Sequence, residues 1–414
     1  MLSFPVLALG LSLFAANASP FQPKPFDWPQ WQGRDRNAVT VETGLLQTWP
    51  KDGPPLAWQA KGLGEGFSTP TVAAGRIFSM GNVEKTEFVM ALAEDGGKPL
   101  WTHEVGPVRA DGGGYHGPRC SPTVDGDLVY ALGLNGDLLC LKVDSGDEVW
   151  RKDLIKVFHG ARGGWGYAES PLIDGDKLLV TPGGKENTLV ALNKKTGDTI
   201  WTCQVPEGDT AAYASITAVE VDGKRQYIQF LGKGVVGVSE DGTFLWRYDT
   251  PANKTANCST PLFSDGCVFA ASSYGAGGGL ACLKKDGDKY TADEVYATKK
   301  MQNHHGGMVL RGGYIYGADD DRLTCLDFKT GKVQWQTNAT GKGSVSCVGN
   351  RLYFRNEGGP VILAEVNPYE YVEHGRFTPT GKTDKPQWAH PVIANGKLYV
   401  RDQDLLFCYD VKKK

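Results

Sequence analysis

The sequence predicts an all-β protein, an eight-bladed β-propeller whose blades are four-stranded antiparallel sheets. Three observations lead to this prediction: a ten-residue pattern recurs, a hairpin precedes each copy, and the two chain ends hold complementary parts of one further unit. The composition agrees, because 54 Gly, 11 Trp and 16 Tyr among 414 residues are typical of short strands joined by tight turns.

The recurring pattern is a Leu followed nine residues later by a Trp, with a glycine turn between them. We expect a strand on each side of this turn, since glycine supplies the positive φ that tight turns need. Copies of it are "LAEDGGKPLW" (92–101), "LKVDSGDEVW" (141–150), "LNKKTGDTIW" (192–201) and "LDFKTGKVQW" (326–335).

A second hairpin comes before each copy. Alternating apolar and polar residues flank a two-residue turn that contains glycine, which is the strongest short-range signal for a β-hairpin. Adding these two strands to the pair around the T-G turn gives four antiparallel strands in each unit. The stretches are "STPTVAAGRIFSMG", "CSPTVDGDLVYALG", "ESPLIDGDKLLVTP", "CSTPLFSDGCVFAA", "GGMVLRGGYIYGAD", "GSVSCVGNRLYFRN" and "AHPVIANGKLYVRD".

The fourth strand of a unit carries a large aromatic residue at intervals of about 40 to 50 residues. This period with four strands per unit predicts propeller blades, with the aromatic ring buried between neighbours. One further unit, "VILAEVNPYEYVEHGRF", has lost both the Gly turn and the Trp. The aromatic positions are Trp101, Trp150, Trp201, Trp246, Tyr296 and Trp335.

The eighth unit is divided between the chain ends. The C-terminal "HPVIANGKLYVRDQDLLFCYDV" supplies three strands and no Trp strand, whereas "PPLAWQAKG" (54–62) is a Trp strand with no three strands before it. Joining them removes an open sheet edge that would invite aggregation. We therefore predict that the N-terminal strand around Trp58 closes the ring.

The chain divides into four parts. Residues 1–18 resemble a signal peptide that is cut near Ala18, with Ala16 and Ala18 in the A-x-A arrangement. Residues 19–53 form an extension that packs on the propeller, residues 54–411 form the propeller, and residues 412–414 form a basic tail. No Cys follows the apolar run, which disfavours a lipid-anchored protein, and nothing later is apolar enough to span a membrane. We expect a monomeric bacterial protein that is periplasmic or secreted.

Nine cysteines are present, and their spacing follows the repeat. Cys140, Cys282, Cys325 and Cys408 precede the Leu of the pattern or its counterpart, where other copies have Ala, so we interpret them as small buried thiols. Cys120 and Cys258 begin equivalent stretches, and a disulfide between these two is left open.

Charge and motifs exclude two classes of function. A net charge of -3 and a pI of about 6.2 give no broad basic surface, so we do not expect nucleic acid as a partner. No C-x-x-C-H motif is present, so we expect no haem.

Chain topology places the short D-G and T-G turns on one face of the ring, here called the turn face. The longer links between second and third strands, and between blades, lie on the other, here called the loop face. Loops of this kind, rich in aromatic, basic and acidic residues over a central channel, favour a ligand site. The candidates are His116, Arg119, Trp165, Tyr167, Glu169, Asn257, His304, His305, Arg355, Glu357, Trp388, His390 and Arg401.

The pattern A/C-L-x-x-x-T/S-G-x-x-x-W resembles the PQQ repeat shared by quinoprotein alcohol dehydrogenases and by the outer-membrane assembly lipoprotein BamB. The resemblance covers most of residues 54–411. The stretches "DWPQWQGRDRN", "GGWGYAESPLIDG", "QNHHGG" and "WAHPVIANGKLYVRDQD" are similar to exported PQQ-like propellers of planctomycete-type bacteria.

A quinoprotein resemblance implies an oxidoreductase acting on an alcohol, polyol or sugar, with PQQ and Ca²⁺ over the channel. Trp165 or Trp388 would then stack on the quinone and Arg119 would contact its carboxylates. Glu169 and Asn257 are the candidate metal ligands. The adjacent Cys-Cys pair of many such dehydrogenases is absent, and the sequence assigns no catalytic residue.

Two other functions fit the same loops: a BamB-like scaffold that binds proteins, and a propeller that binds a carbohydrate on exposed Trp and Tyr rings. Local structural roles also compete with function. Trp165 and Trp388 can pack a long loop, Glu169 can bond to nearby backbone amides, and His304 and His305 can hydrogen-bond within their loop.

Overall fold

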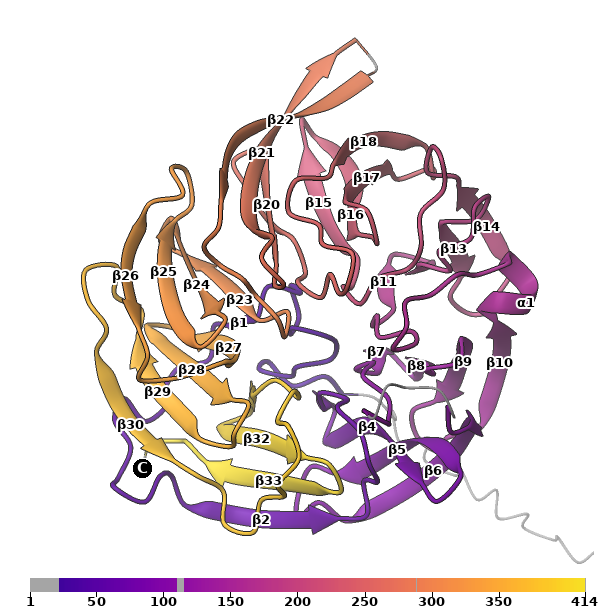
Figure 1. Ribbon diagram of the computed structural model, residues 1–414. Helices are drawn as coiled ribbons and strands as arrows, with labels where there is room; N and C mark the ends of the chain where they lie inside the picture. Colours follow the sequence, from indigo (N-terminus) through magenta and orange to yellow (C-terminus); the bar gives the residue numbers. More distant parts are fainter. Residues whose placement is uncertain (1–21, 110–114, 288, 414) are drawn as a thin grey trace, which may run out of the picture.

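The computed structural model describes residues 22–109, 115–287 and 289–413. Eight separate sheets follow one another around a central channel (Figure 1). The prediction of an eight-bladed all-β propeller is confirmed. Residues 1–18 and the expected cleavage site at Ala18 lie outside the described residues.

Each blade runs from an inner strand at the channel to an outer strand at the perimeter. Blade 1 is β3 (Thr71–Ala73), β4 (Arg76–Val83), β5 (Thr86–Ala93) and β6 (Pro99–Pro107). Blade 2 is β7 (Thr123–Asp125), β8 (Leu128–Leu132), β9 (Asp137–Lys142) and β10 (Glu148–Asp153). Blade 3 is β11 (Leu172–Asp174), β12 (Lys177–Val180), β13 (Leu189–Asn193) and β14 (Thr199–Cys203). Blade 4 is β15 (Thr217–Val221), β16 (Lys224–Phe230), β17 (Val235–Ser239) and β18 (Phe244–Tyr248).

The second half of the ring repeats the plan. Blade 5 is β19 (Leu262–Ser264), β20 (Cys267–Ser272), β21 (Gly277–Asp286) and β22 (Lys289–Thr298). Blade 6 is β23 (Met308–Arg311), β24 (Tyr314–Asp319), β25 (Arg322–Asp327) and β26 (Val333–Thr337). Blade 7 is β27 (Gly343–Val348), β28 (Arg351–Asn356), β29 (Val361–Glu365) and β30 (Glu373–Phe377), with β1 (Val39–Thr40) added in parallel. Blade 8 is β31 (Val392–Ala394), β32 (Lys397–Asp402), β33 (Leu405–Asp410) and β2 (Leu56–Lys61).

Ring closure occurs where the sequence predicts it. Strand β2 pairs antiparallel with β33, and Trp58 lies opposite Cys408. Blade 8 therefore takes its outer strand from the start of the chain and its other three strands from the end.

The outer-strand aromatic of one blade packs against the turn glycine of the next. An added Cβ on Gly146 would lie 2.6 Å from the Trp101 ring, so these glycines are required for contact as well as for positive φ. The indole N–H of Trp101 also donates to the carbonyl of Val143 at 2.9 Å. The same pairing joins Trp58 to Gly97, Trp150 to Gly197, Trp201 to Gly242 and Tyr296 to Gly331.

Blade 7 lacks its aromatic, and the N-terminal extension replaces it. Gly375 occupies the outer-strand position opposite Leu363, where other blades have Trp or Tyr. Trp49, which is buried, packs on Gly375 and lies edge-on to Tyr353 and Phe377 at 5.6 and 5.4 Å. The sequence shows the loss of this Trp but not its replacement.

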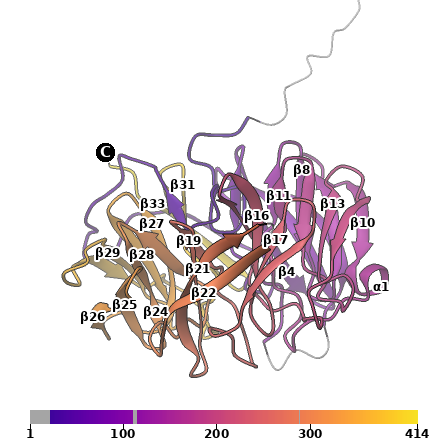
Figure 2. The same cartoon turned by 90° about the horizontal axis from the view of Figure 1, so that it is seen from above.

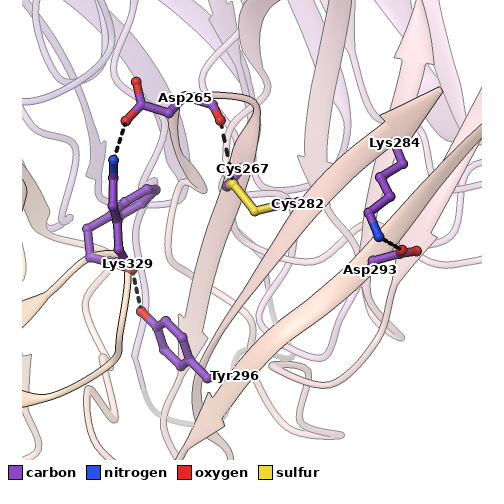
Figure 3. Close-up of a disulfide and its surroundings, with 8 residues drawn as sticks. Asp265, Cys267, Cys282, Lys284, Asp293, Tyr296 and Lys329 are labelled. Atoms are coloured by element: carbon purple, nitrogen blue, oxygen red, sulfur yellow. Dashed lines mark hydrogen bonds and ion pairs between the residues drawn. A yellow bond between two sulfur atoms is a disulfide. The ribbon is translucent and has the colours of Figure 1, made fainter.

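The interpretation of Cys282 as a buried thiol is wrong. Cys282 forms a disulfide with Cys267, which lies directly opposite it on β20 (Figure 3). The reason is register: Leu280, not Cys282, faces the blade aromatic Tyr296, because the long β21–β22 hairpin shifts the pattern by two residues. Cys140, Cys325 and Cys408 are buried free thiols.

The disulfide between Cys120 and Cys258 does not form. Both residues are free thiols, Cys120 buried and Cys258 half-buried. Cys120 instead bonds within its own blade, where its sulfur accepts from the Leu132 amide.

The N-terminal extension enters the channel from the turn face, where the Asp27 carboxylate accepts from the Ala74 amide and from Asn395. It then crosses the middle of the ring (Figure 1). Along the way Trp28 pairs with Val72 of blade 1, and the Ala38 carbonyl accepts from Cys347 of blade 7. The edge-on view shows the start of the described chain rising from one side of the disc (Figure 2). The extension therefore blocks the channel from below the loop face.

The described residues include one α-helix, α1 (Leu154–Phe158), which the Asp153 carboxylate caps at its N-terminus. No helix in this part of the chain has the length and apolar character needed to cross a membrane.

Candidate ligand-binding site

A cavity of about 250 Å³ lies on the channel, between the loop face and the N-terminal extension. Its walls come from the links between blades and from two links between second and third strands. The lining residues are Trp31, Phe67, Thr69, Tyr115, Arg119, Trp165, Ala168, Tyr213, Ser215, Ala256, Cys258, Tyr274, His304, His305, Lys342, Glu357, Trp388 and His390. We call this cavity the channel pocket.

Aromatic rings form most of its wall. Trp388 packs against Phe67 and Tyr115, with ring centroids 4.4 and 4.8 Å apart. On another side Trp165 meets Tyr213 edge-on at 5.7 Å. Tyr115 and Tyr274 are about half exposed, so the pocket opens between rings that solvent can reach. Such a wall suits a flat or ring-shaped ligand.

Trp31 of the extension contributes to the floor. Its ring lies 4.5 Å from that of His390, and its indole N–H donates to the Thr260 hydroxyl at 2.9 Å. The Arg36 guanidinium anchors the same segment by donating to the Ser170 and Pro171 carbonyls. The depth of the pocket is therefore set by residues that precede the propeller in the sequence.

The three histidines of the pocket are neutral at pH 7. Burial lowers the pKa of His304 and of His390 to about 4, and it also lowers the pKa of His305. His390 Nε2 lies 2.9 Å from the His305 carbonyl, so it donates and leaves Nδ1 as an acceptor.

Four ring nitrogens in this cluster are buried without a hydrogen-bond partner among the described residues. They are His304 Nδ1, both nitrogens of His305, and His390 Nδ1. Unpaired buried polar atoms are costly, and a bound ligand or water can satisfy them.

Two cationic side chains and one carboxylate line the channel pocket. Arg119 donates to the Gly117 and Tyr115 carbonyls and lies over the Phe67 ring; burial lowers its pKa to about 10, so it stays charged. Lys342 lies 3.4 Å from Glu357. Burial raises the pKa of Glu357, but contacts with His305, Trp388 and Lys342 outweigh it and hold the pKa at about 2.

Seven of the thirteen sequence candidates line the pocket. They come from five inter-blade or inter-strand links and meet at the channel. They are Arg119, Trp165, His304, His305, Glu357, Trp388 and His390.

The other six candidates lie outside its lining. Arg401 is buried and donates to the Ser68 carbonyl and the Ser79 hydroxyl, which fixes the start of blade 1. Arg355 is buried and donates to the Gly359 carbonyl and to Gln387. The Tyr167 hydroxyl donates to the Pro182 carbonyl, and His116 is half-buried beside the pocket loop.

The candidate metal ligands do not form one site. Glu169 is buried and accepts from the Thr181 amide, while the Asn257 side chain donates to the Leu231 and Gly232 carbonyls. No cluster of three or more His, Cys, Asp or Glu side chains able to hold a metal ion occurs among the residues that the structure describes.

The donor set of the pocket does not fit a calcium-quinone pair. Ca²⁺ takes six to eight oxygen ligands, several of them carboxylates. Glu357 is the only carboxylate among the described lining residues, and its Oε1 already accepts from the Trp388 indole at 2.7 Å. Arg119 and Lys342 would match the carboxylates of a quinone, but the cation has no comparable ligands.

Sequence reasoning did not select several lining residues, including Trp31, Phe67, Tyr274 and Lys342. The aromatic "DWPQWQG" just before the ring was a usable signal for Trp31. Tyr274 and Lys342 lie in short links, "SSYGAG" and "ATGKGS", that contain no other aromatic or basic residue.

Fold and pocket together define a PQQ-repeat propeller with a ligand-sized cavity on its channel. The family model described as outer membrane protein assembly factor BamB matches residues 85–337, which is more than half of the chain. The chain belongs to this family.

Curated relatives agree with this assignment. BamB of Alteromonas naphthalenivorans is 25% identical over 275 residues, which is 61% of this chain and 62% of that protein, so the match spans less than two thirds of the relative. BamB of Salmonella typhimurium is 21% identical over 354 residues, which is 74% of this chain and 86% of that protein.

Solved structures share the fold. The quinohemoprotein alcohol dehydrogenase of Comamonas testosteroni is 14% identical with a TM-score of 0.66, covering 96% of this chain and 82% of its own. BamB of Moraxella catarrhalis is 15% identical with a TM-score of 0.54, covering 81% of this chain and 94% of its own. At such identities the likeness concerns architecture alone.

Proposed function

We propose that this protein is a carbohydrate-binding propeller whose channel pocket receives one sugar or polyol ring. The observation that supports this best is the pairing of an aromatic wall with neutral histidines, four of whose ring nitrogens lack a hydrogen-bond partner among the described residues. The size of the cavity, about 250 Å³, suits a single ring with its substituents.

The chemistry of the wall matches that of a sugar. The C–H faces of a pyranose ring stack on indole and phenol rings such as Trp388 and Tyr115. A hydroxyl group both donates and accepts, so it can satisfy either tautomer of a neutral imidazole. A ligand without hydrogen-bonding groups would not satisfy the four unpaired nitrogens of His304, His305 and His390.

We do not propose a quinone-dependent oxidation. The single carboxylate of the pocket is committed to Trp388 and Lys342, which leaves too few oxygen ligands for Ca²⁺. We therefore propose binding of a sugar without a calcium-quinone reaction.

Binding is tested by thermal shift and calorimetry with a panel of neutral and acidic monosaccharides and with PQQ, with and without Ca²⁺. Ligand binding to the native state raises its stability, so at least one sugar should increase the melting temperature. Trp388→Ala should abolish that increase. Trp201→Phe is the matched control, since Trp201 lies on an outer strand away from the pocket.

Two results would refute the proposal: no sugar stabilises the protein, or Trp388→Ala binds as the wild type does. Stabilisation by PQQ with Ca²⁺, together with sugar-dependent dye reduction, would favour the oxidoreductase instead.

A protein-binding scaffold is the second candidate, and the match to the BamB family favours it. In that case an unfolded outer-membrane β-barrel polypeptide should bind with the same affinity to the wild type and to Trp388→Ala. Competition by sugars would argue against this alternative.

We further propose that the protein works outside the cytoplasm. Disulfides persist mainly in oxidising compartments, and Cys267–Cys282 is one. The resemblance of residues 1–18 to a signal peptide points the same way. Mass spectrometry of the protein from fractionated cells of a bacterial host should find a new N-terminus near residue 19 and an intact disulfide.

A further inference from the structure

A second, more open cavity of about 390 Å³ adjoins the channel pocket on the loop face. Lys342 and Glu357 line both cavities, so the two are neighbours across these side chains. We call the second cavity the lysine groove. Its lining residues are Lys342, Asn356, Glu357, Gly358, Lys382, Asp384, Lys385 and Pro386.

Positive charge dominates the two cavities together. The described lining residues include four cations, Arg119, Lys342, Lys382 and Lys385, against two carboxylates, Glu357 and Asp384. No described residue forms an ion pair with Lys382 or Lys385. This local excess contrasts with the net charge of -3 of the whole chain.

Buried residues hold the groove in shape. The Asp402 carboxylate accepts from the Thr383 amide at 2.6 Å and from Gln387 at 2.8 Å, which fixes both ends of the loop that carries Lys382 and Lys385. Arg355 bonds the opposite wall at the Gly359 carbonyl. A Cβ on Gly359 would lie 2.5 Å from the Lys382 chain, so this glycine makes room for the lysine stem.

We propose that the channel pocket and the lysine groove form one site for an acidic oligosaccharide. This inference rests on the proposed function: one sugar ring occupies the pocket, and the anionic groups of the following residues lie along the lysines. Arg119 and Lys342 receive the acid group of the first ring. Lys382 and Lys385 receive those of the next.

A single-stranded nucleic acid also combines rings with anions, but the chain favours sugar. The overall negative charge of the chain repels a long polyanion. The three lysines of the groove can neutralise the charge of only a short anionic chain. The neutral histidines at the floor match hydroxyls, which a nucleobase lacks.

The test uses calorimetry on the full protein with uronate trimers of gluco, galacto and manno configuration, each with its neutral methyl ester. We expect at least one acid to bind about tenfold more tightly than its ester, since each exposed ion pair contributes up to a few-fold. Lys382→Gln with Lys385→Gln should reduce that difference to the part that Arg119 and Lys342 supply at the first ring, while binding of the monosaccharide is kept. Lys98→Gln with Lys195→Gln removes the same charge on the turn face and should change nothing.

The outcomes separate the two proposals. If sugars bind but acids and esters bind equally, or if the lysine double variant keeps the full preference of the wild type, the acidic-chain inference is overturned and the sugar pocket stands. If no saccharide binds at any length, both are overturned. Tight binding of a hexathymidylate in place of the trimers would identify a nucleic-acid site and overturn the inference.

Discussion

The tryptophans on the outer strands and those on the loop face have different roles. On the perimeter, Trp101, Trp150 and Trp201 each pack on a glycine of the next blade and donate to a carbonyl there. In the channel pocket, Trp388 donates to a carboxylate and Trp165 lies against a tyrosine. A tryptophan whose N–H is bound by a neighbouring turn is structural, whereas one that faces a charged or open space is available to a ligand.

Blade 4 shows why the distinction depends on the neighbour. Trp246 occupies the same repeat position as Trp201, but blade 5 offers no short turn because its third and fourth strands form the long β21–β22 hairpin. Trp246 is buried and donates instead to Gln226 of its own blade at 2.9 Å. The repeat therefore determines that a Trp stands at this position, and the adjacent blade determines which acceptor its indole N–H finds.

The largest expected effect comes from a substitution that disrupts the contact between an outer-strand Trp and the turn glycine of the next blade. Gly146→Val should destabilise the protein by about 4 kcal/mol, because Gly146 has φ +73° and its Cβ would meet the Trp101 ring at 2.6 Å. Gly126→Ala is the control, since Gly126 also has positive φ but faces open space. It should cost only about 1 to 2 kcal/mol by urea denaturation. Equal costs would mean that the ring contact is unimportant.

The next effect concerns buried carboxylates near the loop face. Burial raises the pKa of Glu87 and of Glu169 to about 8 from 4.5. Above pH 4.5 the unfolded chain therefore binds fewer protons than the folded chain, and stability falls as pH rises toward 8. Each residue should contribute a loss of about 4 kcal/mol over this window.

Denaturation measured from pH 4.5 to 8 tests this slope. Glu87→Gln and Glu169→Gln should each flatten the curve, and Glu240→Gln, a change in an exposed carboxylate, should leave it unchanged. A stability that rises across this range would contradict the assignment.

A smaller loss of stability is expected when only the indole hydrogen bond of a perimeter tryptophan is removed. Trp201→Phe keeps a ring over Gly242 but loses the donation to the Glu240 carbonyl, so we expect a loss of about 1 to 2 kcal/mol. Sugar affinity should be unaffected. A change in affinity would show that the perimeter and the pocket are coupled.

The smallest stability effect belongs to the pocket. Trp388→Phe removes the donor to Glu357 at the half-exposed mouth, and we expect less than about 1 kcal/mol by urea denaturation. Sugar affinity should nevertheless fall several-fold, because the stacking face is smaller. If stability fell by more than the Trp201→Phe loss, Trp388 would be a structural residue.

The sequence predicts the ring well because the repeat is carried by local signals. Glycine turns and alternating strands specify each blade, and the divided eighth unit specifies closure at Trp58. Prediction fails where a residue depends on a partner far away in sequence. Trp49 filling the place of the missing aromatic at Gly375 is such a case. Cys282 is missed for another reason, because the pattern in its own blade is shifted by two residues, and Cys282 forms a disulfide with Cys267 on the neighbouring strand.

The pocket is less predictable for a related reason. Topology places loops on one face, but it does not say which side chains turn toward the channel. Arg401 and Arg355, chosen as ligand contacts, lie outside the pocket lining and donate to neighbouring carbonyls and side chains, while Trp31 reaches the floor from outside the repeats.

Closure of blade 8 by β2 also determines when the ring can be completed during protein synthesis. Strand β2 around Trp58 is synthesised before the other seven blades, whereas its partner strand β33 (Leu405–Asp410) is synthesised after them. The nascent chain must therefore keep β2 unpaired until the other seven blades have been synthesised. Contacts this distant in sequence slow folding, so the cell has a long interval in which a chaperone can hold the nascent protein before the circle is complete.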